Sequence, residues 1–479
     1  MIADRYDLIV VGGGITGAGV FREAVKTGAK VLLVEQNDFA SGTSSWSSKL
    51  VHGGLRYLKT GEWRLTLESV RERQHLLEQA PGLVETQPFL MPLYQGKKPG
   101  KTTMRLGLWL YDRMAGVSTS KWLSADQALS LEPQLNRDGL LGAMAFDDAR
   151  TDDVRLVLRL IFEGVDEGGT ALNYTAAQPL RESGRLCGVE LKTPGHADVR
   201  RIKAGVVVNA TGAWSDTWGG PNTNTLSLRP LRGSHFVFPL SKLPIRRAVS
   251  WLHPKDRRPV FAYPWQGAVL FGTTDLDHDG DLHAPRMSRD EARYLLEGLA
   301  YQFPELRLSA SDAISAYAGV RPVVASGKST PSAESRESAM WSEPGLVGIT
   351  GGKLTTFRVT ARQVLREAAK QVPSLAPVAD QTVFKPRLPA AAAESISGTP
   401  YDWNQLRHSA QHEQVQHLDD LMMRRTRLGL LLPRGGEAVL DRVGAICKTE
   451  LGWDDARWQQ ERTRYLDYWQ RQHDPGNIA

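Results

Sequence analysis

The clearest pattern of apolar and polar positions lies at the beginning of the chain. Residues 7–11 form an apolar run after one aspartate, which is typical of a strand buried on both faces of a parallel sheet. Three glycines follow, residues 15–27 carry a helical pattern, and residues 29–35 form a second apolar run that ends in an acid. Strand, glycine turn, helix and strand within about 30 residues predict a βαβ unit.

Further segments of both periodicities follow this unit. A loop rich in Ser, Gly and Thr is expected at 38–54, and a helix at 65–77. Buried strands are expected at 204–210 and 346–349, the second followed by two glycines and a helix at 355–369. Short strands with the texture of an antiparallel sheet are expected at 236–239, 260–263 and 269–272. Fragments of one nucleotide-binding domain are thus interleaved with a second domain.

These segments predict an α/β fold with a Rossmann-type domain, a mostly antiparallel β-sheet domain and a short helical domain. The Rossmann-type domain is assigned to about 1–80, 150–225 and 310–375, and the substrate domain to about 81–149 and 226–309. Residues 376–479 begin with a linker and continue as a helical region rich in Arg and Trp. In that region we expect the arginines near Arg424 to form a solvated face. The apolar residues Val415, Leu418, Leu421 and Met422 are expected to pack on the body of the molecule.

Composition indicates a globular protein but does not identify its ligand. Of 479 residues, 41% are hydrophobic and 23% charged, as in a globular protein with a sizeable core, which argues against disorder. The net charge of +6 fits an anionic substrate, an anionic membrane or a nucleic acid equally well. Cys187 and Cys447 are far apart, which excludes a disulfide framework and a thiol-ligated zinc site, and no metal site is expected. Without a leader or an apolar run of roughly 18 residues, the protein is expected to be cytoplasmic.

The glycine turn carries the first chemical signal. Residues 12–17 read Gly-Gly-Gly-Ile-Thr-Gly. In this pattern Gly12 permits the tight turn, Gly14 lets the backbone approach a pyrophosphate, and Gly17 lets the helix pack on the sheet. Glu35 stands 18 residues after Gly17, where a carboxylate can hold the ribose hydroxyls and would disfavour a 2′-phosphate. Strand, turn, helix and acid together predict a dinucleotide site.

The loop after the second strand favours FAD over NAD. Residues 41–49 supply many hydroxyl groups and small side chains, as a ligand with a second phosphate and a ribityl chain requires. The late strand that ends near residues 209–212 would return the chain to the same nucleotide. The turn at residues 351–356 would place another helix N-terminus against a polar ring or a phosphate.

Several of these runs resemble one family. Residues 43–58, Thr-Ser-Ser-Trp-Ser-Ser-Lys-Leu-Val-His-Gly-Gly-Leu-Arg-Tyr-Leu, look like the signature of the FAD-dependent glycerol-3-phosphate dehydrogenases. So do the runs at 232–235, 272–275, 317–322 and 351–356, and the resemblance holds in order from about residue 5 to 370.

The resemblance implies a fold and a reaction. The fold is that of the D-amino-acid-oxidase-like flavoproteins, in which a sheet caps the flavin. The reaction is oxidation of sn-glycerol 3-phosphate to dihydroxyacetone phosphate, with electrons passed to quinone at the inner face of the cytoplasmic membrane. Residues 419–429 resemble the family again, whereas residues 376–415 look like a shortened version of its helical cap.

Binding of a phosphate dianion calls for convergent cations. Arg56 and Arg321 each lie in a glycine-containing turn beside Tyr57 or Pro322, and we expect them to clamp the phosphate together with Lys353. By spacing alone, capping of a helix or pairing with a surface acid is favoured for each arginine taken singly, and the resemblance reverses this preference. Tyr57 is expected to orient the substrate.

His235 is the expected base for the hydroxyl proton, because the ordinary pKa of histidine suits proton acceptance near neutrality. Lys353 is an alternative base, or a cation that steadies the reduced flavin. His52 raises the question of a covalent flavin link, which we do not expect. The FAD-binding residues expected from the turns, the loop and the resemblance are Gly12, Gly14, Ile15, Thr16, Gly17, Glu35, Thr43, Ser44, Ser47, Ser48, Leu50, Ala177, Ala210, Thr211, Gly212, Gly352, Lys353, Leu354 and Thr355.

Alternatives remain open for substrate, acceptor and class. The same chemistry could act on a longer polyol phosphate or use oxygen, and an amino-acid oxidase of the same fold would also need an arginine for its substrate. A non-catalytic or RNA-modifying flavoprotein is supported only by the net charge, and no nucleic-acid partner is expected. The apolar, aromatic stretch at 105–111, flanked by basic residues, fits a peripheral contact with anionic lipid or a core helix equally well. A homodimer is left open.

Overall fold

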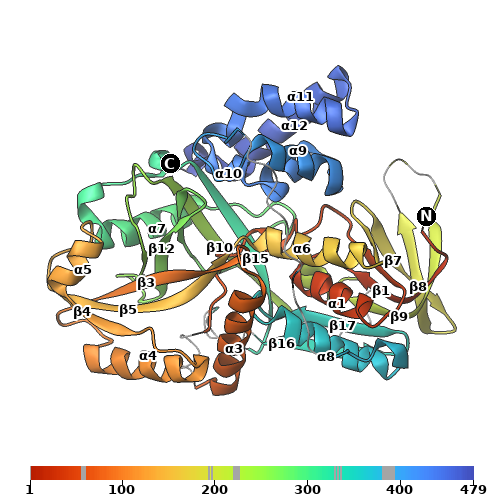
Figure 1. The fold of residues 1–479 in the computed structure, drawn as a ribbon, viewed down its shortest axis with the longest axis horizontal. Helices are drawn as coiled ribbons and strands as arrows, with labels where there is room; N and C mark the ends of the chain where they lie inside the picture. The colour runs from red at the N-terminus through yellow and green to blue at the C-terminus, as the bar shows by residue number, and fades with distance from the viewer. Residues whose placement is uncertain are drawn as a thin grey trace.

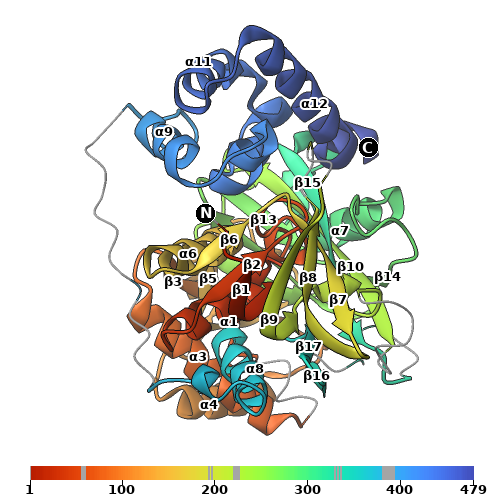
Figure 2. The same ribbon diagram turned by 90° about the vertical axis from the view of Figure 1, so that its right-hand side faces the viewer.

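The computed structural model describes residues 2–54, 61–192, 195, 198–218, 227–327, 331, 334, 337–379, 384 and 394–478. Two β-sheets lie beside each other, and a group of helices from the C-terminal region covers their junction (Figure 1). Figure 2, turned by 90°, shows these helices as a separate layer above the first sheet. Among the described residues, no helix combines the length and apolar character needed to cross a membrane.

The first sheet is built around β1 (Arg5–Val11), which pairs in parallel with β2 (Val31–Val34) on one side and β9 (Arg200–Asn209) on the other. Its strands have buried side chains on both faces, because Leu8 and Val10 point to one core and Ile9 and Val11 to another. The parallel pairs confirm the predicted βαβ unit. The remaining strands of this sheet are β6 (Thr170–Leu172), β7 (Ala176–Glu182), β8 (Arg185–Lys192), β16 (Ser338–Glu343) and β17 (Leu346–Gly351).

Three helices cover one face of the first sheet. They are α1 (Ile15–Val25), α6 (Asp153–Asp166) and α8 (Phe357–Ala369). Apolar side chains of all three pack with those of β1, β2 and β9 in one buried cluster. The other face is covered by the antiparallel hairpin of β7 and β8. The helix predicted from 15 is confirmed, although it ends at Val25 because the chain turns at Gly28, whose φ is +81°.

The second sheet is mostly antiparallel, as predicted, and among its described strands only β3 and β11 pair in parallel. Its strands are β3 (Val84–Tyr94), β4 (Lys121–Ser124), β5 (Leu140–Thr151), β10 (Leu228–Pro239), β11 (Ala248–Leu252), β12 (Pro259–Trp265), β13 (Ala268–Gly272), β14 (Leu276–Asp277) and β15 (Ser315–Val324). The predicted strand at 236–239 is confirmed as the end of the longer β10. Helices α5 (Ala125–Leu131) and α7 (Arg289–Gln302) pack on this sheet.

The expectation that Arg321 lies in a turn is wrong. It lies on β15, opposite Leu231 of β10, in a ladder that runs from Leu228 and Val324 to Val237 and Ser315. Backbone pairing with β10 therefore overrides the turn preference of the neighbouring glycine and proline. Through this pairing β15 belongs to the second sheet, and it also contacts β17 of the first sheet. The domain boundaries expected from the sequence stay a prediction.

The C-terminal region is helical, as predicted. It contains α9 (Trp403–His412), a π-helical turn (Asp420–Arg425), α10 (Leu428–Leu431), α11 (Leu440–Leu451) and α12 (Asp455–His473). Val415, Leu418, Leu421 and Met422 are buried in a cluster that also holds residues of the second sheet, which confirms their predicted packing on the body. At the opposite edge of the molecule, α3 (Trp63–Gln79) lies against α4 (Lys101–Ala115) (Figure 1).

Candidate active site

The glycine turn after β1 is shaped by close backbone contacts. Gly12 has a φ of +109°, and a Cβ atom there would lie 2.5 Å from the carbonyl oxygen of Ala210 at the end of β9. A Cβ atom at Gly17 would lie 1.9 Å from the carbonyl oxygen of Gly12. Only glycine fits either position, so the first turn of α1 can pack directly on the turn and direct its amide groups at the end of the sheet.

The hydroxyl-rich loop meets this turn. The backbone N–H of Ile15, at the start of α1, donates to Ser44 Oγ at 2.9 Å. Thr43 Oγ1 donates to the carbonyl oxygen of Val320 on β15 at 2.5 Å. A Cβ atom at Gly319 would come within 2.5 Å of Trp46 Cβ, so β15 passes close to the loop. The loop is therefore held between the two sheets.

Glu35 stands directly after β2 and faces the same turn. Its Oε2 accepts from the N–H of Gly13 at 2.8 Å, and its Oε1 accepts from the N–H of Asn37 at 2.9 Å. Burial raises the pKa of Glu35, and these two backbone hydrogen bonds oppose that shift. Each carboxylate oxygen keeps a further lone pair that can accept from a ribose hydroxyl.

The late glycine turn, at residues 351–352, lies beside the end of β9. Thr350 Oγ1, near the end of β17, donates to the carbonyl oxygen of Gly212 at 3.0 Å, so the ends of β17 and β9 are tied together. Gly351 and Gly352 have φ values of +73° and +81°, which bring the chain back toward the first sheet before α8 begins. Lys353 Nζ donates to Ser69 Oγ of α3 at 3.3 Å.

One cavity of about 480 Å³ is lined by all of these segments. Its volume is in the range of cofactor and ligand sites. Among the residues expected from the sequence, those that line it are Gly12, Gly14, Ile15, Thr16, Glu35, Thr43, Ser44, Ser47, Ser48, Ala177, Ala210, Thr211, Gly212, His235, Arg321, Gly352, Lys353 and Leu354. We call it the central cavity.

Five expected residues do not line the central cavity or cannot be placed in it. Gly17 packs under the glycine turn, and Leu50 is buried in the apolar cluster of the second sheet. Thr355 is buried and donates through Oγ1 to the carbonyl oxygen of His52 at 3.2 Å. Arg56 and Tyr57, expected to bind the substrate, lie outside the described residues.

The central cavity fits FAD. The absence of side chains at Gly12 and Gly14 leaves backbone amide groups open toward a pyrophosphate, and a Cβ atom at Gly14 would lie 3.2 Å from Ser44 Oγ. Glu35 would hold the adenosine ribose, the start of α1 and Ser44 would hold the phosphates, and the turn at Gly352 would face the ring. All these segments line one continuous space, as a single extended cofactor requires.

His235 lies on β10, at the second-sheet end of the central cavity, and is 1% exposed. Its Nε2 is 2.9 Å from Ser48 Oγ, and its ring stacks on Tyr317 with centroids 4.8 Å apart. Burial, followed by the positive charges of Arg321 and Lys49, holds the pKa of His235 well below its ordinary value. The imidazole is therefore neutral near pH 7, in the form that can accept a proton.

Arg321 projects from β15 into the central cavity and is already paired. Its Nη1 donates to Asp275 Oδ1 at 2.6 Å, and Nη2 donates to the carbonyl oxygen of Thr274 at 3.3 Å. Arg258 Nη2 lies 3.6 Å from the other oxygen of Asp275. Both guanidinium groups thus face one carboxylate, and the bond to Asp275 fixes the orientation of Arg321. A Cβ atom at Gly233 would lie 2.0 Å from Arg321 Nη2, so glycine there makes room for this arginine.

Sequence reasoning missed a buried ion network behind the loop. Lys49 Nζ donates to Asp153 Oδ1 at 2.9 Å, and Arg427 pairs with Asp153 and with Asp152, at 3.0 Å from the latter. Burial, and then the charge of Arg427, lower the pKa of Lys49 to about 8. No local pattern in the sequence marks this network, because Lys49, Asp153 and Arg427 come from segments far apart in the chain.

The solvated face expected near Arg424 is also wrong. Arg424 and Arg425 are 4% and 2% exposed, because both reach across to the buried carboxylate of Asp38 after β2. Arg425 Nη1 lies 2.6 Å from Asp38 Oδ2. The charge pattern alone does not reveal partners that are supplied by a distant part of the chain.

Comparison with known proteins places these features in context. Residues 7–364 match the family model described as FAD dependent oxidoreductase, and residues 362–458 match the model of the C-terminal domain of alpha-glycerophosphate oxidase. An aerobic glycerol-3-phosphate dehydrogenase of Staphylococcus haemolyticus is 38% identical over 77% of this chain and 68% of its own length. The protein of the same name from Bacillus subtilis is 39% identical over 76% of this chain and 67% of its own length.

Solved structures show the same arrangement over most of the chain. The glycerol-3-phosphate dehydrogenase from Bacillus halodurans complexed with FAD is 27% identical, with a TM-score of 0.76 over 98% of this chain and 95% of that one. The L-alpha-glycerophosphate oxidase from Mycoplasma pneumoniae with FAD bound is 18% identical, with a TM-score of 0.61 over 81% of this chain and all of that one, and shares the fold. Glycine oxidase from Geobacillus kaustophilus shares the fold over 77% of this chain, at 21% identity and a TM-score of 0.55.

Proposed function

Because the chain belongs to the FAD-dependent oxidoreductases and, within them, to the glycerol-3-phosphate dehydrogenases, we propose that it oxidises sn-glycerol 3-phosphate to dihydroxyacetone phosphate. The observation that carries this proposal is the juxtaposition of two features in the central cavity. A cradle for a dinucleotide occupies the first-sheet side, and a buried imidazole with a fixed guanidinium occupies the second-sheet side.

The residues on the second-sheet side have separable tasks. Arg321, oriented by Asp275, binds the phosphate of the substrate, and Lys353 adds a second positive charge. Arg56 and Tyr57 remain proposed substrate ligands on the strength of the sequence. His235, with Ser48 against its Nε2, takes the proton of the secondary hydroxyl group. FAD, when bound, accepts the hydride from the carbinol carbon.

An amino-acid oxidase is the strongest competing function, because glycine oxidase shares the fold. Its substrate would present a carboxylate monoanion to Arg321. Arg321 and Lys353 both line the central cavity, and two cations favour a phosphate dianion over a monoanion.

Steady-state assays with an artificial electron acceptor separate these functions. Turnover of glycerol 3-phosphate should exceed that of erythritol phosphate and of glycine by at least about 100-fold, since a site built for one set of polar groups rejects analogues that leave them unpaired. Negligible turnover of glycerol 3-phosphate beside brisk turnover of either alternative would overturn the proposal.

The electron acceptor is proposed to be quinone. The relatives at 38% and 39% identity are named dehydrogenases, whereas the glycerophosphate oxidase is 18% identical. Reduction of a soluble quinone analogue should therefore be faster than oxygen consumption at equal glycerol 3-phosphate. The opposite order of rates would assign the protein to the oxidases.

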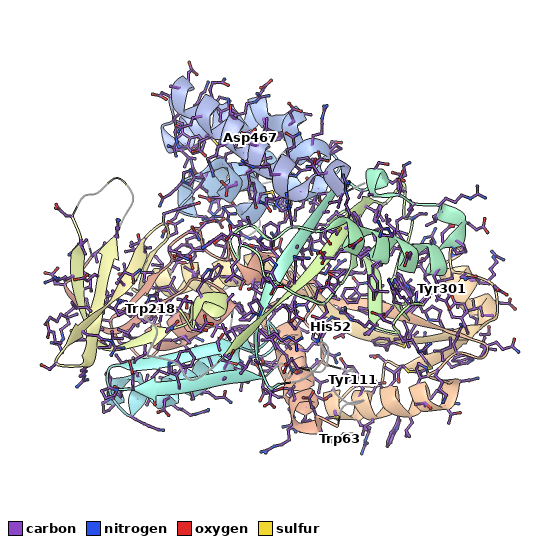
Figure 3. All side chains as sticks on the ribbon, turned by 180° about the vertical axis from the view of Figure 1, so that it is seen from behind. His52, Trp63, Tyr111, Trp218, Tyr301 and Asp467 are labelled. Atoms are coloured by element: carbon purple, nitrogen blue, oxygen red, sulfur yellow. The ribbon has the colours of Figure 1, made fainter. Side chains whose placement is uncertain are left out.

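A membrane-facing edge fits a quinone-linked reaction, and we propose peripheral binding through α4. Leu106 and Trp109 of α4 are 65% and 57% exposed, and Trp63 at the start of α3 is 51% exposed. Figure 3 shows Trp63 on the same edge of the molecule as α4. Arg105 and Arg113 are exposed on the same helix, as contact with anionic lipid requires. Cosedimentation with anionic vesicles should fall sharply in the double variant Leu106→Ser, Trp109→Ser, and unchanged cosedimentation would remove this edge from the proposal.

A further inference from the structure

The C-terminal helical region reaches the buried ion network behind the hydroxyl-rich loop, whose residues Ser47 and Ser48 line the central cavity. Arg427, between the π-helical turn and α10, is fully buried although it belongs to a different layer of the fold. Its guanidinium bridges two consecutive carboxylates at the start of α6. Nη2 lies 3.0 Å from Asp152 Oδ1 and also pairs with Asp153 Oδ1, while Nη1 donates to the carbonyl oxygen of Met423 at 2.8 Å.

Asp153 also accepts hydrogen bonds from the hydroxyl-rich loop. Its Oδ2 accepts from the N–H of Ser47 at 3.1 Å and from Ser47 Oγ at 2.7 Å. Its Oδ1 accepts from Lys49 Nζ at 2.9 Å. A single carboxylate, which accepts from Arg427 and Lys49 at Oδ1 and from Ser47 at Oδ2, therefore contacts the residues on both sides of Ser48.

Ser48 in turn contacts the proposed base. Its carbonyl oxygen accepts from Tyr263 OH at 2.8 Å, which fixes the backbone of the loop, and its Oγ lies 2.9 Å from His235 Nε2. His235 is buried, and among the described residues its Nδ1 has no hydrogen-bond partner. The contact with Ser48 is thus the hydrogen bond that the described residues give to this ring, and it constrains the position of Nε2.

We propose that Arg427 is a positioning residue of the oxidation site, acting through Asp153 on the Ser47 to Lys49 loop and so on the contact between Ser48 and His235. This inference rests on the proposed function. The C-terminal region would then position active-site residues in addition to covering the junction of the two sheets. Arg427 does not need to contact the substrate. Its guanidinium fixes the position of Asp153, and the hydrogen bonds of Asp153 fix the loop that contacts His235.

The bridging geometry explains why arginine stands at this position. A guanidinium presents five donors in a plane and can satisfy two carboxylates and a carbonyl oxygen together. A lysine would keep the charge but would contact fewer of these acceptors. Arg427→Lys is therefore the informative substitution, since it preserves charge neutrality in the buried cluster while loosening Asp153.

Arg425→Lys is the matched control. Arg425 is fully buried in the same segment and pairs with a carboxylate of the N-terminal part, as Arg427 does. Its partner Asp38 contacts neither Asp153 nor the residues Ser47 to Lys49 through a hydrogen bond that the described residues show. A loss of docking between the layers should affect both variants, whereas a loss of positioning should affect only Arg427→Lys.

The first measurement is turnover of glycerol 3-phosphate with an artificial acceptor. In Arg427→Lys, kcat should fall about tenfold or more with flavin content unchanged, and in Arg425→Lys it should change less than about threefold. The effects of Arg427→Lys and Ser48→Ala should be clearly less than additive if both act on one contact. Additive effects, or equal losses in the two arginine variants, would overturn the inference.

A second measurement does not depend on the substrate. The ring nitrogen resonances of His235 in the flavin-loaded protein, assigned by their absence in His235→Asn, should move in Arg427→Lys and not in Arg425→Lys. Ser47→Ala, which removes the side-chain contact with Asp153, should move them in the same direction even if Arg427→Lys fails to fold. Unmoved resonances would overturn the inference, whereas a wild-type protein that does not turn over glycerol 3-phosphate would overturn only the proposed function.

Discussion

At the scale of the single residue, the central cavity owes its chemistry to a few side chains whose charges are fixed by their neighbours. His235 is kept neutral by burial and by nearby cations, and Arg321 is held in one orientation by Asp275. These residues come from strands paired with each other, so the distance between the proposed base and the proposed phosphate ligand is set by the ladder of β10 and β15. Preorganisation of this kind removes the cost of orienting the groups during reaction.

Arg321→Ala tests the role of the guanidinium. We expect KM for glycerol 3-phosphate to rise at least about tenfold while bound flavin is retained, because a charge-assisted contact with the phosphate is lost. Flavin content is measured by the visible spectrum of the purified variant and KM by steady-state kinetics. Arg258→Gln is the control, since Arg258 also faces Asp275 but does not line the central cavity. Loss of flavin with unchanged KM would assign Arg321 to the cofactor instead.

Many residues of the site could be predicted from the sequence, and the failures have a physical cause. The glycine turn, Glu35 and the hydroxyl-rich loop form a local pattern with fixed spacing, and the structure places most of them around one cavity. Lys49, Asp153 and Arg427 were missed because their contact depends on the folding of segments far apart in the chain. Local charge patterns indicate solvation by default, and only the tertiary structure reveals that the charges are buried together.

At the scale of the element, the start of α1 decides whether the cofactor cradle forms. Gly17→Ala should weaken FAD binding and destabilise the fold by about 1–3 kcal/mol, because the added Cβ would lie 1.9 Å from the carbonyl oxygen of Gly12 and must push helix and turn apart. Chemical denaturation and flavin titration of the apoprotein measure the two effects.

Gly107→Ala is the matched control for this prediction. Gly107 is also helical, on α4, but a Cβ atom there would meet nothing within 4 Å. That substitution should be neutral or stabilising by up to about 1 kcal/mol, because alanine favours a helix more than glycine does. Equal changes in stability for the two substitutions would show that the contact between Gly17 and Gly12 does not limit the turn.

Elements themselves were predicted with uneven success. Buried strands such as β1 and β9 were clear, because their apolar runs are continuous. The longer β10 was recognised only at its end, since Arg232, Gly233 and Ser234 interrupt its apolar pattern while their backbones continue to pair with β15. Polar residues near a functional site thus interrupt the apolar pattern by which a strand is recognised in the sequence.

At the scale of the whole molecule, α12 ties the C-terminal layer to the body through His473. Its Nδ1–H donates to the carbonyl oxygen of Ala316 on β15 at 2.9 Å, and its ring lies 5.0 Å from that of Trp46. Burial lowers the pKa of His473 to about 4. The order of layers, and therefore this contact, could not be read from the sequence, because helical periodicity does not specify a partner.

The pKa of His473 predicts how stability depends on pH. The unfolded chain binds a proton at this side chain near pH 6.5, whereas the folded protein does so only near pH 4, so stability is lost as the pH falls from about 6.5 to 4. Between pH 7 and pH 5, protonation of His473 in the unfolded chain should lower the free energy of unfolding by roughly 2 kcal/mol. Urea denaturation at both values should show a smaller drop for His473→Gln. An identical drop in wild type and variant would mean that His473 is not protonated differently on folding.

We propose that the central cavity holds both FAD and the site that oxidises glycerol 3-phosphate. The most direct test is the visible spectrum of the purified, flavin-loaded protein without oxygen, before and after addition of glycerol 3-phosphate. We predict that the flavin band bleaches and that dihydroxyacetone phosphate forms in an amount equal to the flavin reduced. A flavin band that persists with glycerol 3-phosphate, although dithionite bleaches it, would contradict the account.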